Sequence, residues 1–502
     1  MKNKLNQKFK NNSDLILTIA LALGILILIN FFSYNFFIRR DLTASGLYSI
    51  SPATKQTIKN LPDVVNVKVY FSRDLPSQFL PIRQSLTDLL DEYRGYSKNF
   101  KVQYLDPKDG AEAEAAGIPK LQFNDLRTDK LEVVNGYMGL VINYRDKSEV
   151  IPAVQNVANF EYELTSRLKK LTGDLPTVGF VSGHGSPDFN NSLAGVQQEI
   201  AKLYPTEAVV ANKIPDKVKT LVIVAPKENF SDDELKSLDK FLMQGNSIIV
   251  LVDGIGIGEN LQPVENKSNL IDWLAKYGVK VNRNLVADTS AGIASFSQGI
   301  VTFSVAYPYW PKLVNNNFDQ TNPLVSGLDG VVLPWASSLD IDQSKLAPGE
   351  QITPLAKSSS EAWLSQGSFQ LNPSQQFVRP AKTDQYNLAL VASGKIKSAY
   401  SDATTEQGRL YVVGDGDFIQ DNFWRGNPSN LVLAQNLIDG ASLGSDLVSI
   451  RTKQAGSRSL ANISDVNKQI YRYLNIFGIT VLVLGYGLVR YFLRKKTKTI
   501  EI

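Results

Sequence analysis

Residue types that could do chemistry gather in two short segments of this chain. Residues 182–187 (SGHGSP) contain His184, the only histidine in the 502-residue sequence, and residues 415–417 read Asp-Gly-Asp. Each segment follows an apolar run that predicts a β-strand, and α/β sheets bind ligands at the carboxyl ends of their strands. The candidate ligand cleft is therefore formed by Gly183, His184, Gly185, Asp188, Asp415 and Asp417.

The imidazole of His184 has two readings. It could contact a ligand, or the glycine-flanked turn could simply pass the chain from strand to helix while the ring bonds a neighbouring backbone group. A Ser-His-Asp triad with Ser186 and Asp188 is disfavoured, because these residues lie too close in sequence and no G-x-S-x-G elbow is present. We therefore assign no catalytic residue.

Other cofactor and metal signals are absent from the sequence. Asp415 and Asp417 could present carboxylates to a cation or a sugar hydroxyl, but they lack the further ligands of a calcium loop, and such a pair commonly caps a turn. The glycines at 254–258 do not have dinucleotide-binding spacing, and no Walker motif occurs, so this chain does not itself hydrolyse ATP. With no cysteine, thiolate zinc sites, disulfides and thiol nucleophiles are excluded. We expect neither a cofactor nor a metal.

The surrounding pattern predicts a larger, doubly wound α/β domain. Its helix near 232–242 begins with a capping box, in which Ser231 and Glu234 have the required spacing, and Leu235, Leu238 and Leu242 mark its buried side. A second helix is expected near 193–203. The expected strands are 177–181, 221–225, 247–252 and 409–414.

A smaller α/β core precedes it. Residues 64–71 and 101–105 read as strands around a helix at 83–97, and 138–142 and 149–152 read as a hairpin. The order suggests a thioredoxin-like layout. The position of a redox C-x-x-C motif holds Ser72-Arg73-Asp74-Leu75, so thiol chemistry is unavailable.

Two apolar runs, residues 15–38 and 474–493, have the length of membrane-spanning helices. Lysines and arginines gather outside both runs at the chain ends, which favours cytoplasmic termini and an exported body at a bacterial cytoplasmic (inner) membrane. A cleaved signal peptide is the alternative for the first run. The ends carry the positive charge, so the middle is mildly acidic and nucleic-acid binding is not expected.

These features divide the chain into four parts. Residues 1–40 form a cytoplasmic tail and the first transmembrane helix, and residues 41–172 form the thioredoxin-like domain with a linking helix. Residues 173–467 form the larger domain, with an inserted lobe at about 289–395, and residues 468–502 form the second transmembrane helix and a basic cytoplasmic tail.

Several segments together resemble the gliding-motility-associated (GldG-type) ABC transporter auxiliary family. They are DLTASGLYSISPATKQTIKNLPDVVNVKVYFSRDLP, VGFVSGHGSPDF, DDELKSLDKFLMQGNSIIVLVDG, GRLYVVGDGDFIQDNF and ASLGSDLVSIRTK. The resemblance implies a membrane-anchored extracytoplasmic subunit that accompanies an ABC permease and its ATPase. It also implies a central intraflagellar-transport-type domain of glutamine-amidotransferase-like topology. Family members often have glutamate where this chain has Ser186.

Three functions remain open from the sequence. The first is a non-enzymatic auxiliary subunit of an ABC transporter. The second is a degenerate exported hydrolase that uses His184 and the aspartates, and the third is a transporter-independent protein that binds an envelope polysaccharide or another envelope ligand. Aromatic residues of the inserted lobe could stack on sugars, although such rings more often fill a core. They are Phe303, Tyr307, Tyr309, Trp310, Trp335 and Trp363.

Overall fold

A computed structural model describes residues 21, 24, 25, 49–107, 110–127, 130–154, 157, 160–173, 175–298, 301–443, 450 and 465–498. The chain divides into two compact units, Met1–Ala455 and Gly456–Ile502. Almost all of the first predicted membrane span, residues 15–38, lies outside the described residues.

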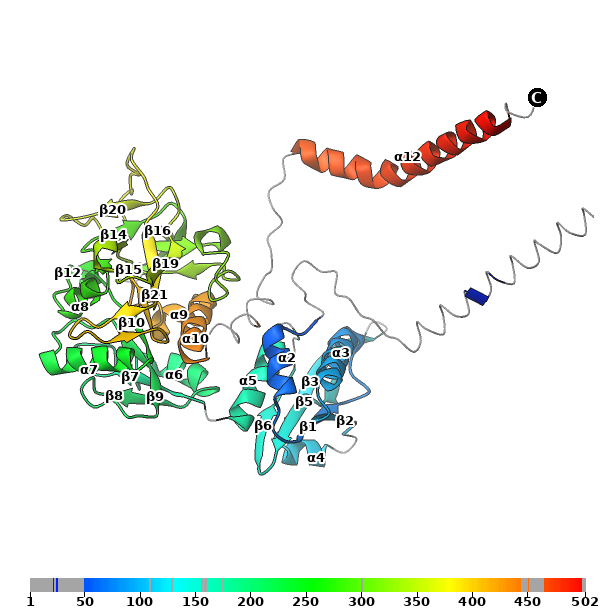
Figure 1. The fold of residues 1–502 in the computed structure, drawn as a ribbon, viewed down its shortest axis with the longest axis horizontal. Helices are drawn as coiled ribbons and strands as arrows, with labels where there is room; N and C mark the ends of the chain where they lie inside the picture. The colour runs from blue at the N-terminus through cyan, green and yellow to red at the C-terminus, as the bar shows by residue number, and fades with distance from the viewer. Residues whose placement is uncertain are drawn as a thin grey trace, which may run out of the picture. The chain divides into compact units, whose positions relative to one another are not determined.

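A four-stranded sheet, of order β2-β1-β5-β6, forms near the N-terminus (Figure 1). Strand β1 (Val65–Phe71) pairs in parallel with β2 (Phe100–Leu105) and antiparallel with β5 (Met138–Tyr144). β5 forms a hairpin with β6 (Lys147–Ile151). Helix α3 (Leu80–Tyr96) supplies the crossover that two parallel neighbours require. The predicted strand-helix-strand unit and the hairpin are both confirmed.

Further helices and a second hairpin complete this small α/β part. α2 (Pro52–Lys59), through Ile58, and α5 (Phe160–Thr172), through its leucines, contribute to the same core as β1 and α3. α4 (Ala111–Ala115) follows β2, and β3 (Leu121–Arg127) pairs antiparallel with β4 (Lys130–Gly136).

The larger sheet has a parallel half of order β24-β10-β9-β7-β8. These strands are β24 (Arg409–Val413), β10 (Ser247–Leu251), β9 (Val218–Val224), β7 (Thr177–Val181) and β8 (Thr206–Val209). The chain runs from β7 outward to β8 and then returns to the other side of β7 to form β9. The order of strands therefore reverses between β7 and β9, which is where open α/β sheets place ligands.

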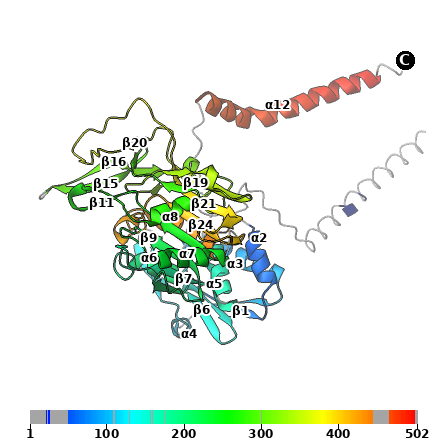
Figure 2. The ribbon, with the colours of Figure 1, turned by 60° about the vertical axis from the view of Figure 1, so that its left-hand side comes forward.

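Helices cover both faces of this sheet (Figure 2). α6 (Ala194–Ala201) and α10 (Pro428–Leu443) pack on one face, and α7 (Asp232–Met243) and α8 (Leu270–Lys276) pack on the other. The predicted capping box is confirmed, because the Ser231 and Glu234 side chains each bond the other's backbone N–H. The larger part is thus a mixed, mostly parallel sheet between two helical layers.

Residues 289–395, expected to form an inserted lobe, are partly built into the sheet. β18 (Leu339–Ile341), β19 (Glu350–Lys357) and β21 (Asn387–Gly394) extend it, with β21 antiparallel to β24. β13 (Val279–Val281) pairs with β18 and ends the row. The physical reason is that these strands pair with partners far along the chain, which local composition does not report.

The rest of that stretch forms a separate β-rich layer. β15 (Ala291–Gln298) and β16 (Val301–Leu313) make a long hairpin, and β17 (Val331–Val332) pairs with the end of β16. β14 (Leu285–Ala287) pairs with β20 (Trp363–Ser365). The remaining elements are short: β11 (Ile255–Ile257), β12 (Pro263–Glu265), β22 (Ile396–Lys397), β23 (Thr404–Thr405) and α9 (Asp421–Trp424).

The unit Gly456–Ile502 contains the helix α12 (Asp465–Lys498). Among the described residues, no single helix has the length and apolar character to cross a membrane. Two segments of α12, Gln469–Gly478 and Leu482–Phe492, meet the criterion together by length and composition, with a bend of 47° between them.

Candidate functional site

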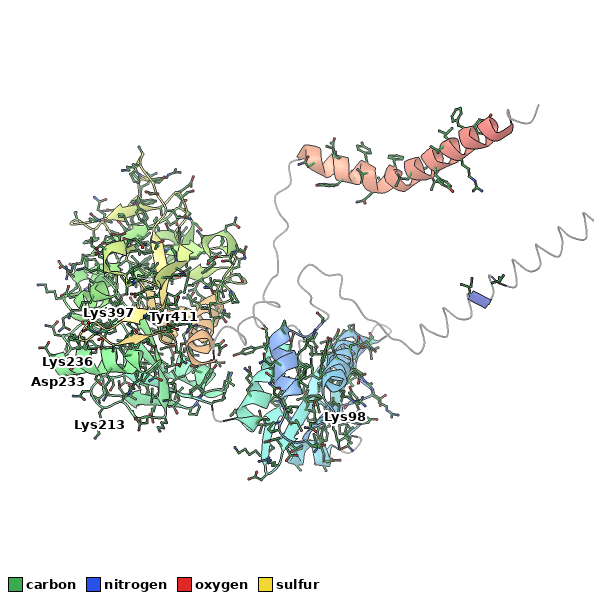
Figure 3. All side chains as sticks on the ribbon, in the orientation of Figure 1. Lys98, Lys213, Asp233, Lys236, Lys397 and Tyr411 are labelled. Atoms are coloured by element: carbon green, nitrogen blue, oxygen red, sulfur yellow. The ribbon has the colours of Figure 1, made fainter. Side chains whose placement is uncertain are left out.

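The predicted site residues lie in the loops that follow β7 and β24, at the carboxyl ends of parallel strands. Tyr411 in the middle of β24, labelled in Figure 3, is only 2% exposed, so the strand that carries the aspartates runs through the core. The side chains at this edge form two groups, and the loop after β9 contacts both.

The ring of His184 is held by three neighbours. It stacks on Phe230 with 3.7 Å between ring centroids. Its Nδ1 donates to the Asn229 carbonyl oxygen at 3.1 Å, and its Nε2 lies 3.3 Å from Oε1 of Glu234. Both ring nitrogens therefore face partners in the segment that starts α7, as the backbone-bonding interpretation of this histidine predicts.

The glycine turn itself needs an unusual backbone. Gly183, His184 and Gly185 have φ values of 90°, 56° and 68°, a left-handed run that glycine adopts readily and histidine rarely does. The His184 carbonyl accepts the N–H groups of Lys227 and Glu228, at 2.7 and 2.9 Å. This turn is thereby tied to the loop after β9, across the point where the strand order reverses.

Asp188 does not join this group. It is exposed, and its Oδ1 accepts the N–H of Asn190 at 2.9 Å within its own loop. Its carbonyl accepts the N–H of Leu193 at 3.2 Å, just before α6. Asp188 is therefore a turn-forming residue in this structure.

Asp415 and Asp417 are deeply placed, and a third carboxyl group joins them. Asp415 is fully buried, and its Oδ1 accepts the N–H groups of Asp417 and Phe418 at 2.7 and 3.2 Å. Its Oδ2 is buried and has no hydrogen-bond partner among the described residues. Asp253, which is 5% exposed, accepts the N–H of Gly416 at 2.7 Å.

Sequence reasoning missed Asp253. It lies two residues after the end of β10, in the segment LVDG, so the end of a buried strand was the available signal. A single carboxylate at that position has no characteristic spacing, and its proximity to Asp415 and Asp417 arises only because β10 and β24 are neighbours.

Burial controls the protonation of this carboxyl cluster, defined as Asp253, Asp415 and Asp417. Burial and the nearby charge of Asp417 raise the pKa of Asp253 to about 8. Burial, followed by the charges of Asp253 and Asp417, raises the pKa of Asp415 well above its ordinary value. Burial also raises the pKa of Asp417 to about 6, although Lys227 opposes the rise.

The carboxyl cluster can therefore retain at least one proton near neutral pH, because burial and mutual repulsion disfavour its full ionisation. Among the described residues, no group of three or more histidine, cysteine, aspartate or glutamate side chains could hold a metal ion. The arrangement therefore places buried, partly protonated acids beside one another.

His184 and the carboxyl cluster are neighbours without direct contact. Within the described part of the chain, no hydrogen bond or ion pair joins His184 to Asp415 or Asp417. Lys227 connects the two groups, because its N–H bonds the His184 carbonyl and its positive charge acts on Asp417. The six residues of the predicted cleft thus separate into the His184 turn, the Asp415–Asp417 loop and the outlying Asp188.

The predicted aromatic group is mainly a core. Tyr307 and Tyr309 are 0% and 5% exposed, and the partly buried Trp310, Trp335 and Trp363 pack on the same cluster. Phe303 contacts Phe296, with 6.2 Å between ring centroids. Trp310 and Trp335 meet edge to face at 5.5 Å, and Phe423 of α9 contacts both. Trp335 has a φ of 59°, which is rare for a bulky residue. These contacts favour the interpretation of the rings as packing residues.

Comparison with known proteins supports a full-length relationship. An uncharacterized protein of Borreliella burgdorferi is 26% identical over 515 residues, which covers 97% of this chain and 99% of that protein. Residues 44–143 match a domain of unknown function, DUF7088.

Similar solved structures have low overall scores. The mmIFT52 N-terminal domain is 16% identical, with a TM-score of 0.34, and the match covers 57% of this chain and all of that domain. A ThuA-like protein from Parabacteroides merdae is 8% identical, with a TM-score of 0.28, over 53% of this chain and 90% of that one.

The match that identifies the family covers the larger sheet and its helices. Residues 175–438, more than half of the chain, match a family described as an ABC-type uncharacterized transport system. The chain therefore belongs to this family of ABC-transport auxiliary components.

Proposed function

We propose that this chain is a non-enzymatic, extracytoplasmic auxiliary subunit of a bacterial ABC transporter and associates with a permease and an ATPase. The observation that carries the proposal is the family match over residues 175–438. The sequence has no Walker motif, so ATP hydrolysis would be supplied by a partner.

The geometry of the His184 turn supports a role without catalysis. Both ring nitrogens of the only histidine face Asn229 and Glu234, and its ring face lies on Phe230. A general base needs a free nitrogen within reach of a substrate proton. In this arrangement the imidazole instead fixes the turn against the start of α7.

The proposed membrane arrangement has two spanning helices, formed by residues 15–38 and 474–493, with both termini in the cytoplasm. Its support is the apolar character of the two runs, the lysines and arginines at both chain ends, and the helical α12. Digestion of intact spheroplasts with an external protease should remove the body and leave both terminal tags protected. Tags on opposite faces of the membrane would contradict this topology.

The finer fold assignments belong to the same proposal. The small sheet would be a thioredoxin-like scaffold without a redox motif, and the large sheet a glutamine-amidotransferase-like domain used for binding. The resemblance to gliding-motility-associated auxiliary proteins extends the proposal to a mechanical or transport complex at the cell envelope.

Co-isolation tests the proposed function. The tagged full-length chain is extracted in a mild detergent, and captured proteins are identified by mass spectrometry. We expect a multispan permease and a Walker-containing ATPase in near-stoichiometric amounts, and neither with an equally abundant, unrelated tagged membrane protein. Recovery of neither subunit from chemically crosslinked cells would refute the proposal.

The enzymatic alternative has its own test. If the chain were a hydrolase that uses His184, His184→Ala would abolish its biological activity, whereas an auxiliary subunit that remains folded should retain most of it. His184→Asn is the matched variant, because asparagine tolerates the left-handed backbone found here. Glycan binding that persists in cells without the transporter genes would favour the polysaccharide-binding alternative.

A further inference from the structure

A small pocket opens in the N-terminal α/β part, at the carboxyl ends of the parallel strands β1 and β2. Its cavity volume is about 80 Å³. This is the edge where the sequence has Ser72-Arg73-Asp74-Leu75 in place of a redox motif. The pocket lies between these strand ends and α3, and it is separate from the carboxyl cluster and the His184 turn.

The floor of the pocket is apolar and rigid. Val69 and Phe71 of β1 and Leu86 of α3 contribute to its lining, and they are 1%, 5% and 1% exposed. Such side chains are held by the surrounding core, so the floor is preformed. It offers a surface for a short aliphatic stem.

The rim supplies positive charge that is only partly neutralised. Arg73 is paired with Asp106, since its Nε lies 3.3 Å from Oδ2 and its backbone N–H donates to Oδ1 at 3.2 Å. Arg83, one turn into α3, is partly buried and has no acidic partner among the described residues. Two guanidinium groups and one carboxylate give the lining residues one net positive charge, and Asp88, Asp91 and Arg94 of α3 act on the lining residue Tyr104 from nearby.

Polar groups beside Arg83 complete the rim. Tyr104 and Thr87 also line the pocket. Burial, followed by the charge of Asp91, raises the pKa of Tyr104. A tyrosine hydroxyl is protonated at neutral pH even without this shift, so it can donate a hydrogen bond. A partly buried arginine with a neighbouring hydroxyl suits a planar anion, because guanidinium and carboxylate form two parallel hydrogen bonds.

We propose that this pocket binds one carboxylate group on a short aliphatic stem, with Arg83 contacting the carboxylate and Val69, Phe71 and Leu86 contacting the stem. The small volume suits one such group, and the opening to solvent allows the rest of a ligand to lie outside the pocket. An acidic side chain of a partner protein and a free short-chain acid share this chemistry. The proposal is independent of the transporter assignment.

The test compares acids with their neutral amides on the full-length chain in detergent. The probes are butyrate against butyramide, measured by saturation-transfer NMR, and the peptide Ac-Ala-Ala-Glu-Ala-Ala-amide against its glutamine form, measured by calorimetry. We expect the acidic member of at least one pair to bind roughly tenfold more tightly. Binding of the peptide alone identifies a protein side chain as the ligand, and binding of butyrate identifies a free acid.

Variants assign the effect to Arg83. Arg83→Gln should abolish the preference for the acid, and Arg83→Lys should weaken it, because lysine lacks the planar fork. Arg145→Gln is the matched control: it lies in the same α/β part, pairs with the exposed Asp63 and does not line the pocket. Equal affinity of acid and amide in the wild-type chain would overturn the proposal, whatever the variants do. An acid preference unchanged in Arg83→Lys and Arg83→Gln would also overturn it.

Discussion

The backbone N–H of Gly416 donates to Oδ1 of Asp253 at 2.7 Å in the interior of the larger sheet. This bond joins the loop after β24 to the end of β10, two neighbouring parallel strands. It also orients Asp253 beside Asp415 and Asp417, which the neighbouring positions of β10 and β24 bring into one buried environment.

Asp253→Asn should remove a pH dependence of stability. The folded chain raises the pKa of Asp253 to about 8 from 3.8, so the unfolded chain releases this proton first. Stability from this group is therefore full below about pH 4 and declines as the pH rises to 8. Asparagine cannot ionise and still accepts from Gly416.

The measurement is the thermal midpoint of wild type and Asp253→Asn between pH 4 and 9. The thermal midpoint of Asp253→Asn, relative to that of wild type, should increase as the pH rises. Asp402→Asn, whose side chain is fully exposed, is the control and should follow wild type. Parallel profiles for wild type and Asp253→Asn would contradict the role assigned to burial.

His184→Ala should destabilise the larger domain by about 1 to 2 kcal/mol, because it removes the ring stack on Phe230 and the Nδ1 hydrogen bond to Asn229, and because alanine adopts this positive φ less readily than histidine does. His184→Asn should lose less, since asparagine accepts this backbone more readily. Thermal unfolding of the two variants measures the difference, and equal losses would show that the backbone conformation contributes little.

Gly416→Ala should lower the free energy of unfolding by about 1 to 3 kcal/mol, because the added methyl group overpacks the interior. A Cβ at this position would lie 2.6 Å from the Cβ of Ala225 and 2.9 Å from its backbone, which has little room to move. Gly426→Ala is the matched control, because its nearest neighbour would be 3.7 Å away. Denaturation of both variants tests this, and similar midpoints would refute the close approach.

Asp421→Ala should lower the stability of the first turn of α6 by about 1 kcal/mol, because the Gly195 N–H loses its acceptor. Both oxygens of Asp421 accept the Gly195 N–H, at 3.1 and 2.9 Å, and Oδ1 also accepts the Trp424 indole N–H. Asp421→Asn keeps one acceptor and should lose less. Hydrogen exchange of the Gly195 amide reports the change directly, and unaltered protection in Asp421→Ala would contradict it.

Much of the parallel sheet was predictable because buried strands leave continuous apolar runs. β7 spans the predicted residues, and the Ser231–Glu234 capping box forms as its spacing indicates. The antiparallel additions β18 and β21 were not predictable, since their pairing depends on distant partners.

The candidate site was less predictable than the fold. The sequence indicates that His184 and Asp415 follow strands. It does not indicate that the His184 ring stacks on Phe230 or that its Nε2 faces Glu234. Nor does it indicate that Asp253 meets the aspartate loop, because that proximity follows from the order of strands in the sheet. The local sequence pattern was enough to locate the ends of the strands. Which strand ends lie next to one another depends on the order of strands in the folded sheet.

The ordered row of strands in the large sheet ends in β13 and β8, which have three and four residues. These two brief borders expose few unpaired main-chain groups, which limits strand exchange between copies at the two ends of the row; the eight-residue β19 pairs with β21 beside this row. Recognition of other subunits at these borders would consequently depend on side chains, so the identity of a binding partner can change by substitution without rebuilding the sheet.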